Sequence, residues 1–158
     1  MTIQVADLDF QSESQIEQFL NVLTTYSQEA GAGNQGMSEQ AKADLPRLLN
    51  ELPNRQVLVA IKDELIVGVA VCLSGFSTFK AKPVLNVHDL AVLPSHRGQR
   101  IGSTLLAAAE ARARELGCCK MTLEVISTNE AAHRLYNRLG FDSPSPNLPT
   151  FFLEKPLS

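Results

Sequence analysis

The sequence predicts a mixed α/β protein made of one domain. Segments that alternate apolar and polar residues occur between segments with the helical period, in the order β-α-α-β-β-β-α-β-α-β-β. The chain has 158 residues, within the roughly 100–200 that one domain takes, so we expect a single domain over residues 1–158. Its 44% hydrophobic and 20% charged residues are typical of a globular protein with a core.

Charge and composition disfavour several classes of function. The net charge of −3 argues against a nucleic-acid partner, because proteins that bind phosphate backbones are normally basic. No apolar run approaches the roughly 20 residues that span a bilayer, and residues 1–10 lack the pattern of a secretory signal. The 3 cysteines show no zinc-binding spacing, so we expect no metal and reduced thiols in a cytoplasmic protein.

The first elements follow from alternation and capping. Ile3–Leu8 alternates as a half-buried strand does. Ser12 and Gln15 form a capping box that opens a helix, which should end in the glycine-rich stretch 31–36. The apolar positions of this helix are Ile16, Phe19, Leu20, Leu23 and Tyr26.

A second helical stretch begins near Ser38 and contains a proline. Because proline lacks an N–H group and is best tolerated in a first turn, we expect Pro46 to start a new helix that Asp44 caps.

The middle of the chain is rich in strand-forming residues. Gln56–Ile61 and Leu65–Leu73 should form an antiparallel hairpin through the short turn 62–64. We expect a loop over Ser74–Lys82 and another strand over Pro83–Leu93.

A polar connection, residues 94–100, leads into a helix that ends at Gly117, a residue suited to the position after a helix. The stripe of this helix is Ile101, Leu105, Ala109, Ala113 and Leu116. A strand over Cys119–Ile126 and a helix over Asn129–Leu139 should follow. We expect two final strands, Phe141–Asp142 and Thr150–Glu154, around a proline-rich loop.

The segment from His88 to Ser103 is a strand, a glycine-bearing turn and a helix start. The N–H groups at a helix N-terminus attract anions, and Gly98 and Gly102 allow close approach of the backbone. Arg97 and Arg100 add cations suited to phosphate, so the turn predicts a pyrophosphate site. It lacks the lysine of a Walker loop and the G-x-G-x-x-G spacing of a Rossmann loop. Taken alone, it also fits a loop with two incidental glycines.

Two motifs together resemble the GNAT N-acetyltransferase superfamily. Leu90-Ala91-Val92 followed by Arg97-Gly98-x-x-x-Gly102 resembles its acyl-CoA-binding turn, motif A. Asn129-x-x-Ala132-x-x-Leu135-Tyr136-x-x-Leu139-Gly140-Phe141 resembles its C-terminal helix, motif B. One departure is Arg100, where the family has a glycine.

The resemblance implies a central, twisted, mostly antiparallel sheet flanked by helices. A V-shaped split should separate the strands that precede the motif A and motif B helices. It also implies acetyl-CoA as a co-substrate, with the backbone of Val92 paired to the pantetheine arm and the amides of the turn on the pyrophosphate. The implied binding residues are Leu90, Ala91, Val92, Arg97, Gly98, Gln99, Arg100, Ile101, Gly102, Ser103 and Asn129.

Acetyl transfer to an amine requires a base, because a lysine-like amine is neutral in only about 4 parts in 10⁴ at pH 7. His88 and Asp89 lie on the strand that should reach the thioester. Their side chains point to opposite faces unless a bulge intervenes, so we expect one of them to face the cleft. The alternative is that Asp89 satisfies backbone donors and His88 packs on the sheet. The resemblance nominates Tyr136 as the general acid, against the alternative of a core tyrosine on an apolar stripe.

The sequence therefore predicts an N-acetyltransferase that acts on a primary amine of a small molecule by direct attack in a ternary complex. Two alternatives stay open, a protein or peptide amine acetyltransferase and a catalytically silent acyl-CoA-binding regulatory domain. Residues 24–50 and 74–82 should wall the acceptor side, and Glu29, Glu39 and Asp44 would make that wall anionic. The family's habit and Phe151–Phe152 lead us to expect a homodimer.

Overall fold

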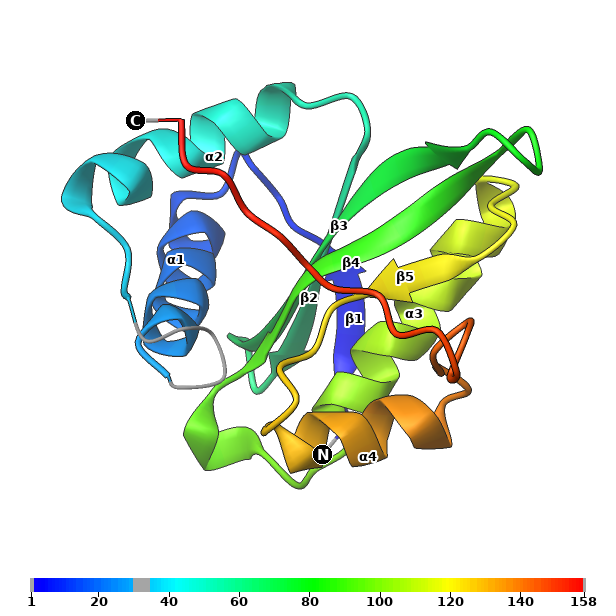
Figure 1. Cartoon of the computed structure of the whole chain (residues 1–158). Coiled ribbons are helices and arrows are strands. Elements are labelled where there is room, and N and C mark those ends of the chain that lie inside the picture. The colour runs from blue at the N-terminus through cyan, green and yellow to red at the C-terminus, as the bar shows by residue number, and fades with distance from the viewer. Residues whose placement is uncertain (1, 30–34, 158) are drawn as a thin grey trace.

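The computed structural model describes residues 2–29 and 35–157 (Figure 1). Its sheet has the strand order β1-β2-β3-β4-β5, which confirms the predicted mixed α/β fold. The strands are β1 (Gln4–Asp7), β2 (Arg55–Lys62), β3 (Leu65–Ser77), β4 (Lys82–Val92) and β5 (Met121–Leu123). The helices are α1 (Glu13–Ser27), α2 (Glu39–Glu51), α3 (Ile101–Glu115) and α4 (Glu130–Arg138), with a short 3₁₀ helix at Pro94–His96.

The strands pair antiparallel except for β4 and β5, which run parallel. Each face of the sheet buries its own core because strand residues alternate between faces. On β2, Leu58 and Ala60 face the core under α3, whereas Val57 and Val59 face the core under α1 and α2. None of the helices in the described ranges is both long and apolar enough to cross a membrane.

Two hairpins build the centre of the sheet. The turn from β2 to β3 places Asp63 and Glu64 at φ values of 50° and 65°, the left-handed pair that suits a two-residue hairpin. β3 and β4 pair as far as Ser77 and Lys82. The expected loop over 74–82 was therefore wrong in extent, because most of it belongs to a long hairpin.

α1 begins as predicted, with the Ser12 side chain accepting from the Gln15 amide. The Gln15 side chain accepts instead from the Asp9 amide at 3.0 Å, so only half of the expected capping box forms. α1 ends at Ser27, and the predicted break over 31–36 lies largely outside the described residues.

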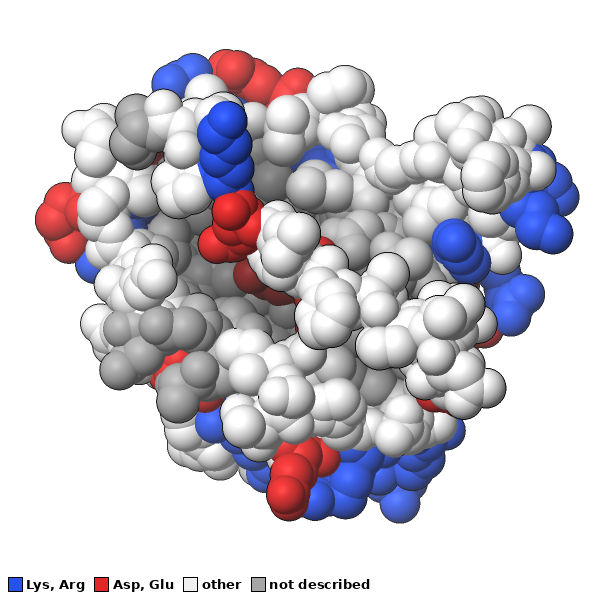
Figure 2. Space-filling model, in the orientation of Figure 1, with Lys and Arg blue, Asp and Glu red and all other residues white. Residues whose placement is uncertain are grey.

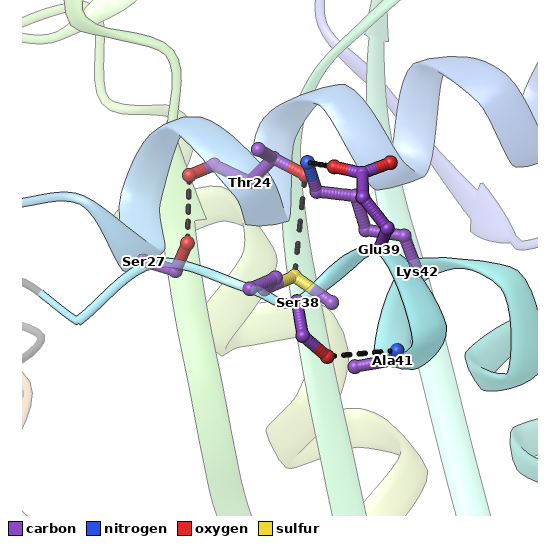
Figure 3. Close-up of polar contacts among 7 residues, drawn as sticks. Thr24, Ser27, Ser38, Glu39, Ala41 and Lys42 are labelled. Atoms are coloured by element: carbon purple, nitrogen blue, oxygen red, sulfur yellow. Dashed lines mark hydrogen bonds and ion pairs between the residues drawn. The ribbon is translucent and has the colours of Figure 1, made fainter.

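The prediction of a helix break at Pro46 was wrong, because α2 is one helix that contains this proline. Ser38 caps its start and Lys42 pairs with Glu39 in its first turn (Figure 3). Leu45 and Leu49 pack into the core beside α1. This burial offsets the hydrogen bond that a proline inside a helix removes.

The N-terminus of α3 packs against the backbone of β3 at Gly68. A Cβ at Gly68 would lie 2.9 Å from Cγ2 of Ile101 and 3.1 Å from Cδ1 of Leu105. Only glycine therefore allows the start of α3 to lie this close to the sheet. At its other end α3 stops before Gly117, whose φ is 73°, as predicted.

The C-terminal part of the chain differs most from the prediction. The strand expected over 119–126 is reduced to β5, and 141–142 and 150–154 form no strands. Residues 141–157 instead run unpaired across the sheet towards α2 (the orange-red and red trace in Figure 1). A three-residue β5 presents a short edge, and the prolines 144, 146 and 149 cannot donate hydrogen bonds to a ladder.

Candidate active site

β4 contains one extra residue beside β3. Val71 pairs with Asp89 and Cys72 pairs with Val87, so His88 has no partner in the ladder. This is a β-bulge, which bends the bulged strand and increases its twist. The sequence allowed for a bulge near His88 and Asp89, and the structure contains one.

The bulge exchanges the two faces of β4. Before it, Leu85 and Val87 belong to the core under α3, and after it Leu90 and Val92 do. The side that faces α3 thus changes from odd to even residue numbers. Asp89, which would otherwise share the face of Val87, lies instead on the face of α1.

β4 and β5 separate at the same position. They pair only from Leu85 to Val87 and from Met121 to Leu123, and the bulge begins one residue later. The edge of β4 from Asp89 to Val92 has no ladder partner among the described strands on that side. This opening is the predicted V-shaped split.

The turn after β4 carries a row of free amides. Gly98 and Arg100 have φ values of 76° and 63°, and no side chain caps the start of α3. Within the described chain, the N–H groups of residues 98–103 have no hydrogen-bond acceptor, and the first bond of the helix runs from Thr104 to Arg100. Arg100 adopts the left-handed conformation that would favour glycine, so the departure at this position preserves the turn.

The split and the turn border an open cavity of about 1240 Å³, and Figure 2 shows that this face of the molecule is hollowed. It is lined by eleven of the predicted site residues, namely Leu90, Ala91, Val92, Arg97, Gly98, Arg100, Ile101, Gly102, Ser103, Asn129 and Tyr136. α1 and its C-terminal end contribute Tyr26 and Glu29. Residues 74–82, expected as an acceptor wall, do not line it.

Three predicted residues lie outside this lining: His88, Asp89 and Gln99. Gln99 accepts a hydrogen bond from Lys62 Nζ at 2.7 Å, and His88 is exposed at the bulge. Asn129 lines the cavity and also caps α4, because its Oδ1 accepts from the Ala132 amide at 3.2 Å. Of the predicted acidic wall, Glu39 pairs with Lys42 on the outer face of α2, as an ordinary solvated helix residue does.

Asp89 is half-buried, and burial raises the pKa of its carboxyl, an effect that the nearby His88 partly offsets. No hydrogen bond or ion pair to this carboxylate is found within residues 2–29 and 35–157. It therefore does not satisfy backbone donors, the alternative that the sequence allowed. A carboxylate with a raised pKa is a better proton acceptor for an ammonium group than a solvated one.

Tyr26 is a site residue that the sequence did not identify, because it completes the apolar stripe of α1. Burial raises the pKa of Tyr26, and the charges of Asp89 and then Glu29 raise it further. The charges of Asp89 on β4 and of Glu29 just after α1 are therefore both felt at the Tyr26 hydroxyl. A tyrosine at the end of an apolar stripe is the signal that could have found it, because its hydroxyl needs polar surroundings.

Tyr136 lines the cavity from α4. Its ring packs edge-on against Phe141 at a centroid distance of 6.0 Å and against the core under α3. Burial, followed by the nearby Tyr26, raises the pKa of the Tyr136 hydroxyl. It therefore stays protonated at neutral pH, as a general acid must.

Cys72 is fully buried, and burial together with Asp89 raises the pKa of its thiol to about 12. A thiol in this state is not a nucleophile at neutral pH. The geometry thus offers no activated group at Cys72 for a covalent intermediate. No cluster of three His, Cys, Asp or Glu side chains that could hold a metal ion occurs in the described parts of the chain.

The residues present fit an acyl-CoA. A row of six amides at a helix N-terminus, beside Arg97 and Arg100, suits a pyrophosphate. The open edge of β4 offers backbone groups to an amide-containing arm, in the manner of strand addition. The turn and this edge line the same cavity.

Comparison with known proteins agrees with this arrangement. Residues 18–141 match the sequence model of a family described as the acetyltransferase (GNAT) family. An aminoalkylphosphonate N-acetyltransferase of Salmonella typhimurium is 36% identical over 89 residues, which cover 56% of this chain and 58% of that protein. A thialysine N-epsilon-acetyltransferase of Bos taurus is 33% identical over 75 residues, 48% of this chain and 44% of that protein. The chain thus matches about half the length of these relatives.

Solved structures share the fold. The structure of AAC(6')-Iy with the bisubstrate analogue CoA-S-monomethyl-acetylneamine superposes with a TM-score of 0.80 at 16% identity, covering 99% of both chains. A structure described as a probable acetyltransferase gives a TM-score of 0.80 at 22% identity, again with 99% coverage of both chains.

We expect Gly102→Val to weaken acetyl-CoA binding at least tenfold, about 1.4 kcal/mol, while the fold survives. A Cβ at Gly102 would meet only Cδ2 of Leu135 within 4 Å, at 3.3 Å, and the end of a flexible side chain can move. The added methyl groups would instead occupy the cavity beside the turn. Calorimetric titration with acetyl-CoA measures the loss.

Gly75→Val is the matched control for this variant, because a Cβ at Gly75 meets nothing within 4 Å and Gly75 does not line the cavity. Its affinity for acetyl-CoA should equal that of the wild type. Equal affinity in a folded Gly102→Val variant would contradict the assignment of the turn.

We expect Asp89→Asn to raise the melting temperature at pH 7 and to lower kcat by about 10²–10⁴. Burial raises the pKa of Asp89 in the folded chain, so the group favours folding when protonated, and this stability is lost as pH rises through the folded pKa. Asparagine carries no charge to desolvate. The gain in melting temperature should therefore shrink as the pH falls towards about 4, the ordinary pKa of an aspartate.

Thermal melts between pH 4 and 8 and the pH profile of kcat/KM test both parts. The wild-type rate should fall as Asp89 is protonated. Glu17→Gln, an exposed control on α1, should change neither the melting temperature nor the rate. A lower melting temperature at pH 7 together with undiminished turnover would show that Asp89 is not a buried base.

Proposed function

Because this chain belongs to the GNAT acetyltransferase family, as the match over residues 18–141 shows, we propose that it transfers an acetyl group from acetyl-CoA to a primary amine of a small molecule. The observation that carries the proposal is the open edge of β4. It leads into six amides that have no acceptor within the described chain. Asp89 lies on β4 itself, and Tyr136 lines the cavity from α4.

The geometry supports a binding role for two parts of the site. The amides of residues 98–103 and the guanidinium of Arg100 hold the phosphates, and the backbone of Leu90–Val92 orients the arm. Acetyl-CoA, when bound, supplies the activated acetyl thioester. Direct attack in a ternary complex is supported by Cys72, whose buried thiol is too weak an acid for an acyl-enzyme route.

Two side chains handle protons. Asp89, which does not line the cavity, accepts the proton of the acceptor's ammonium group through water, from the α1 side of β4. Tyr136 keeps a proton on Oη at neutral pH and is the proton donor on the α4 side. His88 is exposed at the bulge and affects the carboxylate of Asp89 through its charge.

A small acceptor is supported by the lining of the cavity on three sides, by the end of α1, by β4 and the turn after it, and by α4, whereas a protein or peptide amine needs a shallow groove. The names of the two relatives, which refer to aminoalkylphosphonate and thialysine, point to the same class. A panel of amines assayed for thiol release from acetyl-CoA tests the proposal. Binding of acetyl-CoA without turnover of any amine would favour a silent regulatory domain.

We also propose a homodimer in a reducing, cytoplasmic environment. The three cysteines are free, and the tail after α4 exposes large apolar side chains, a feature that marks interaction surfaces. These side chains are Leu148, Phe151, Phe152, Leu153 and Leu157.

Light scattering should give twice the mass of one chain, and a Phe151→Ser/Phe152→Ser variant should shift towards one chain mass with its melting behaviour otherwise preserved. Neither side chain belongs to a buried core, so the substitution costs the single chain little. A wild-type protein with the mass of one chain at working concentration would refute the dimer.

We expect Tyr136→Phe to lower kcat by about 10²–10⁴ while acetyl-CoA affinity and melting temperature stay close to wild type. The change removes one oxygen and keeps the ring that packs on Phe141. Steady-state kinetics, calorimetry and thermal melts measure the three quantities.

Phe141→Leu serves as the control, because it disturbs the same ring contact and leaves the hydroxyl in place. It should change stability more than kcat. A Tyr136→Phe variant that retains more than half of the wild-type kcat, with chemistry limiting the rate, would rule out this role.

A further inference from the structure

One ion pair crosses the cavity from α1 to the turn. Nη2 of Arg97 donates to Oε1 of Glu29 at 2.5 Å, across 68 positions of sequence. Nε of the same arginine donates to the carbonyl oxygen of Val92 at 3.1 Å. The guanidinium is thus held by Glu29 and by the carbonyl oxygen at the end of β4.

The position of this pair is unusual among the ion pairs of the described residues. All the others except one join residues three or four apart on a helix. The exception, Arg112 with Asp7, links α3 to β1 on the outside of the sheet. Within residues 2–29 and 35–157, only the pair of Glu29 and Arg97 has both partners in the lining of the cavity.

The pair is too exposed to be a strong structural link. The side chains of Arg97 and Glu29 are 46% and 32% exposed, and exposed ion pairs stabilise folds by only about 0–1 kcal/mol. A phosphate offers the same guanidinium stronger, bidentate hydrogen bonds. An anionic group bound at the turn would therefore compete well for Arg97.

If the Arg97 side chain moved away to such an anionic group, Glu29 would be left as a free carboxylate in the cavity wall. Glu29 is the one acid among the described lining residues, which also include Arg97, Arg100 and Arg138. It lies one helical turn beyond Tyr26, to whose carbonyl oxygen its amide donates at 3.0 Å. On the side of α1 the wall would then attract a cation.

We propose that Arg97 blocks an acceptor subsite at Glu29 until the acyl donor binds. In this inference, which rests on the proposed function, the pyrophosphate draws Arg97 towards the turn, and Glu29 then binds a positively charged group of the acceptor. The acceptor class is an amine with a second cationic group. The ion pair thereby makes acceptor binding follow donor binding.

Calorimetry of 1,4-diaminobutane binding, with and without saturating coenzyme A, tests this coupling without turnover. For the wild type, coenzyme A should increase diamine affinity at least tenfold. Because coupling between two bound ligands is reciprocal, the diamine should increase coenzyme A affinity by the same factor. Butylamine, which lacks the second charge, should show a smaller increase.

Three variants locate the effect. Glu29→Gln should remove the coupling and lower diamine affinity in the loaded protein by about ten- to a hundredfold, the loss expected for a hydrogen bond between charged groups. The Arg97→Gln variant should bind the diamine with an affinity that does not depend on coenzyme A. Asp7→Asn, which breaks the other long-range ion pair, should behave as wild type does.

Diamine affinity that is independent of coenzyme A in the wild type, or unaffected by Glu29→Gln, would overturn the proposal. A wild-type protein that is saturated with coenzyme A and binds no diamine would overturn it as well. If coenzyme A binds and other amines are acetylated, such results remove only this inference. If coenzyme A itself fails to bind, the proposed function fails first.

Discussion

The β-bulge at His88 bends β4 away from β5 and exchanges the faces of the strand. Without the extra residue, Asp89 would point to the core under α3, and the ladder with β5 could continue past Val87. With it, Asp89 lies on the side of α1, and the edge of β4 is free to pair with a ligand. Glycine at position 68 then allows the start of α3, and the turn before it, to lie against this same stretch.

Burial creates the reactivity of the proposed site and opposes its stability. It raises the pKa of Asp89, Tyr136 and Cys72 together, but the consequences differ. The carboxyl becomes a better proton acceptor, the phenol stays a proton donor, and the thiol becomes inert. An ionised Asp89 without a partner costs folding free energy at neutral pH, and the packed sheet around it offsets that cost.

Local signals in the sequence predicted much of the fold and of the turn. Ser12 and Gly117 act on neighbouring backbone groups, so their roles at helix ends can be recognised from a few residues. Pro46 and the C-terminal strands were predicted wrongly because burial of Leu49 and the absence of a ladder partner are tertiary effects. Tyr26 was missed because it completes an apolar stripe, although a tyrosine at the end of such a stripe is a signal. The contact of Glu29 with Arg97 joins distant segments, and a single sequence carries no signal for such a pair.

Hydrogen exchange at the turn tests the central claim, that free amides at the start of α3 bind the acyl donor. In the free protein the amides of residues 98–103 lack acceptors within the described chain and should exchange rapidly. Added acetyl-CoA should slow exchange there and along Leu90–Val92, while the β2–β3 turn at 63–64 stays unchanged. Protection elsewhere on the molecule, with rapid exchange retained over 98–103, would contradict the account.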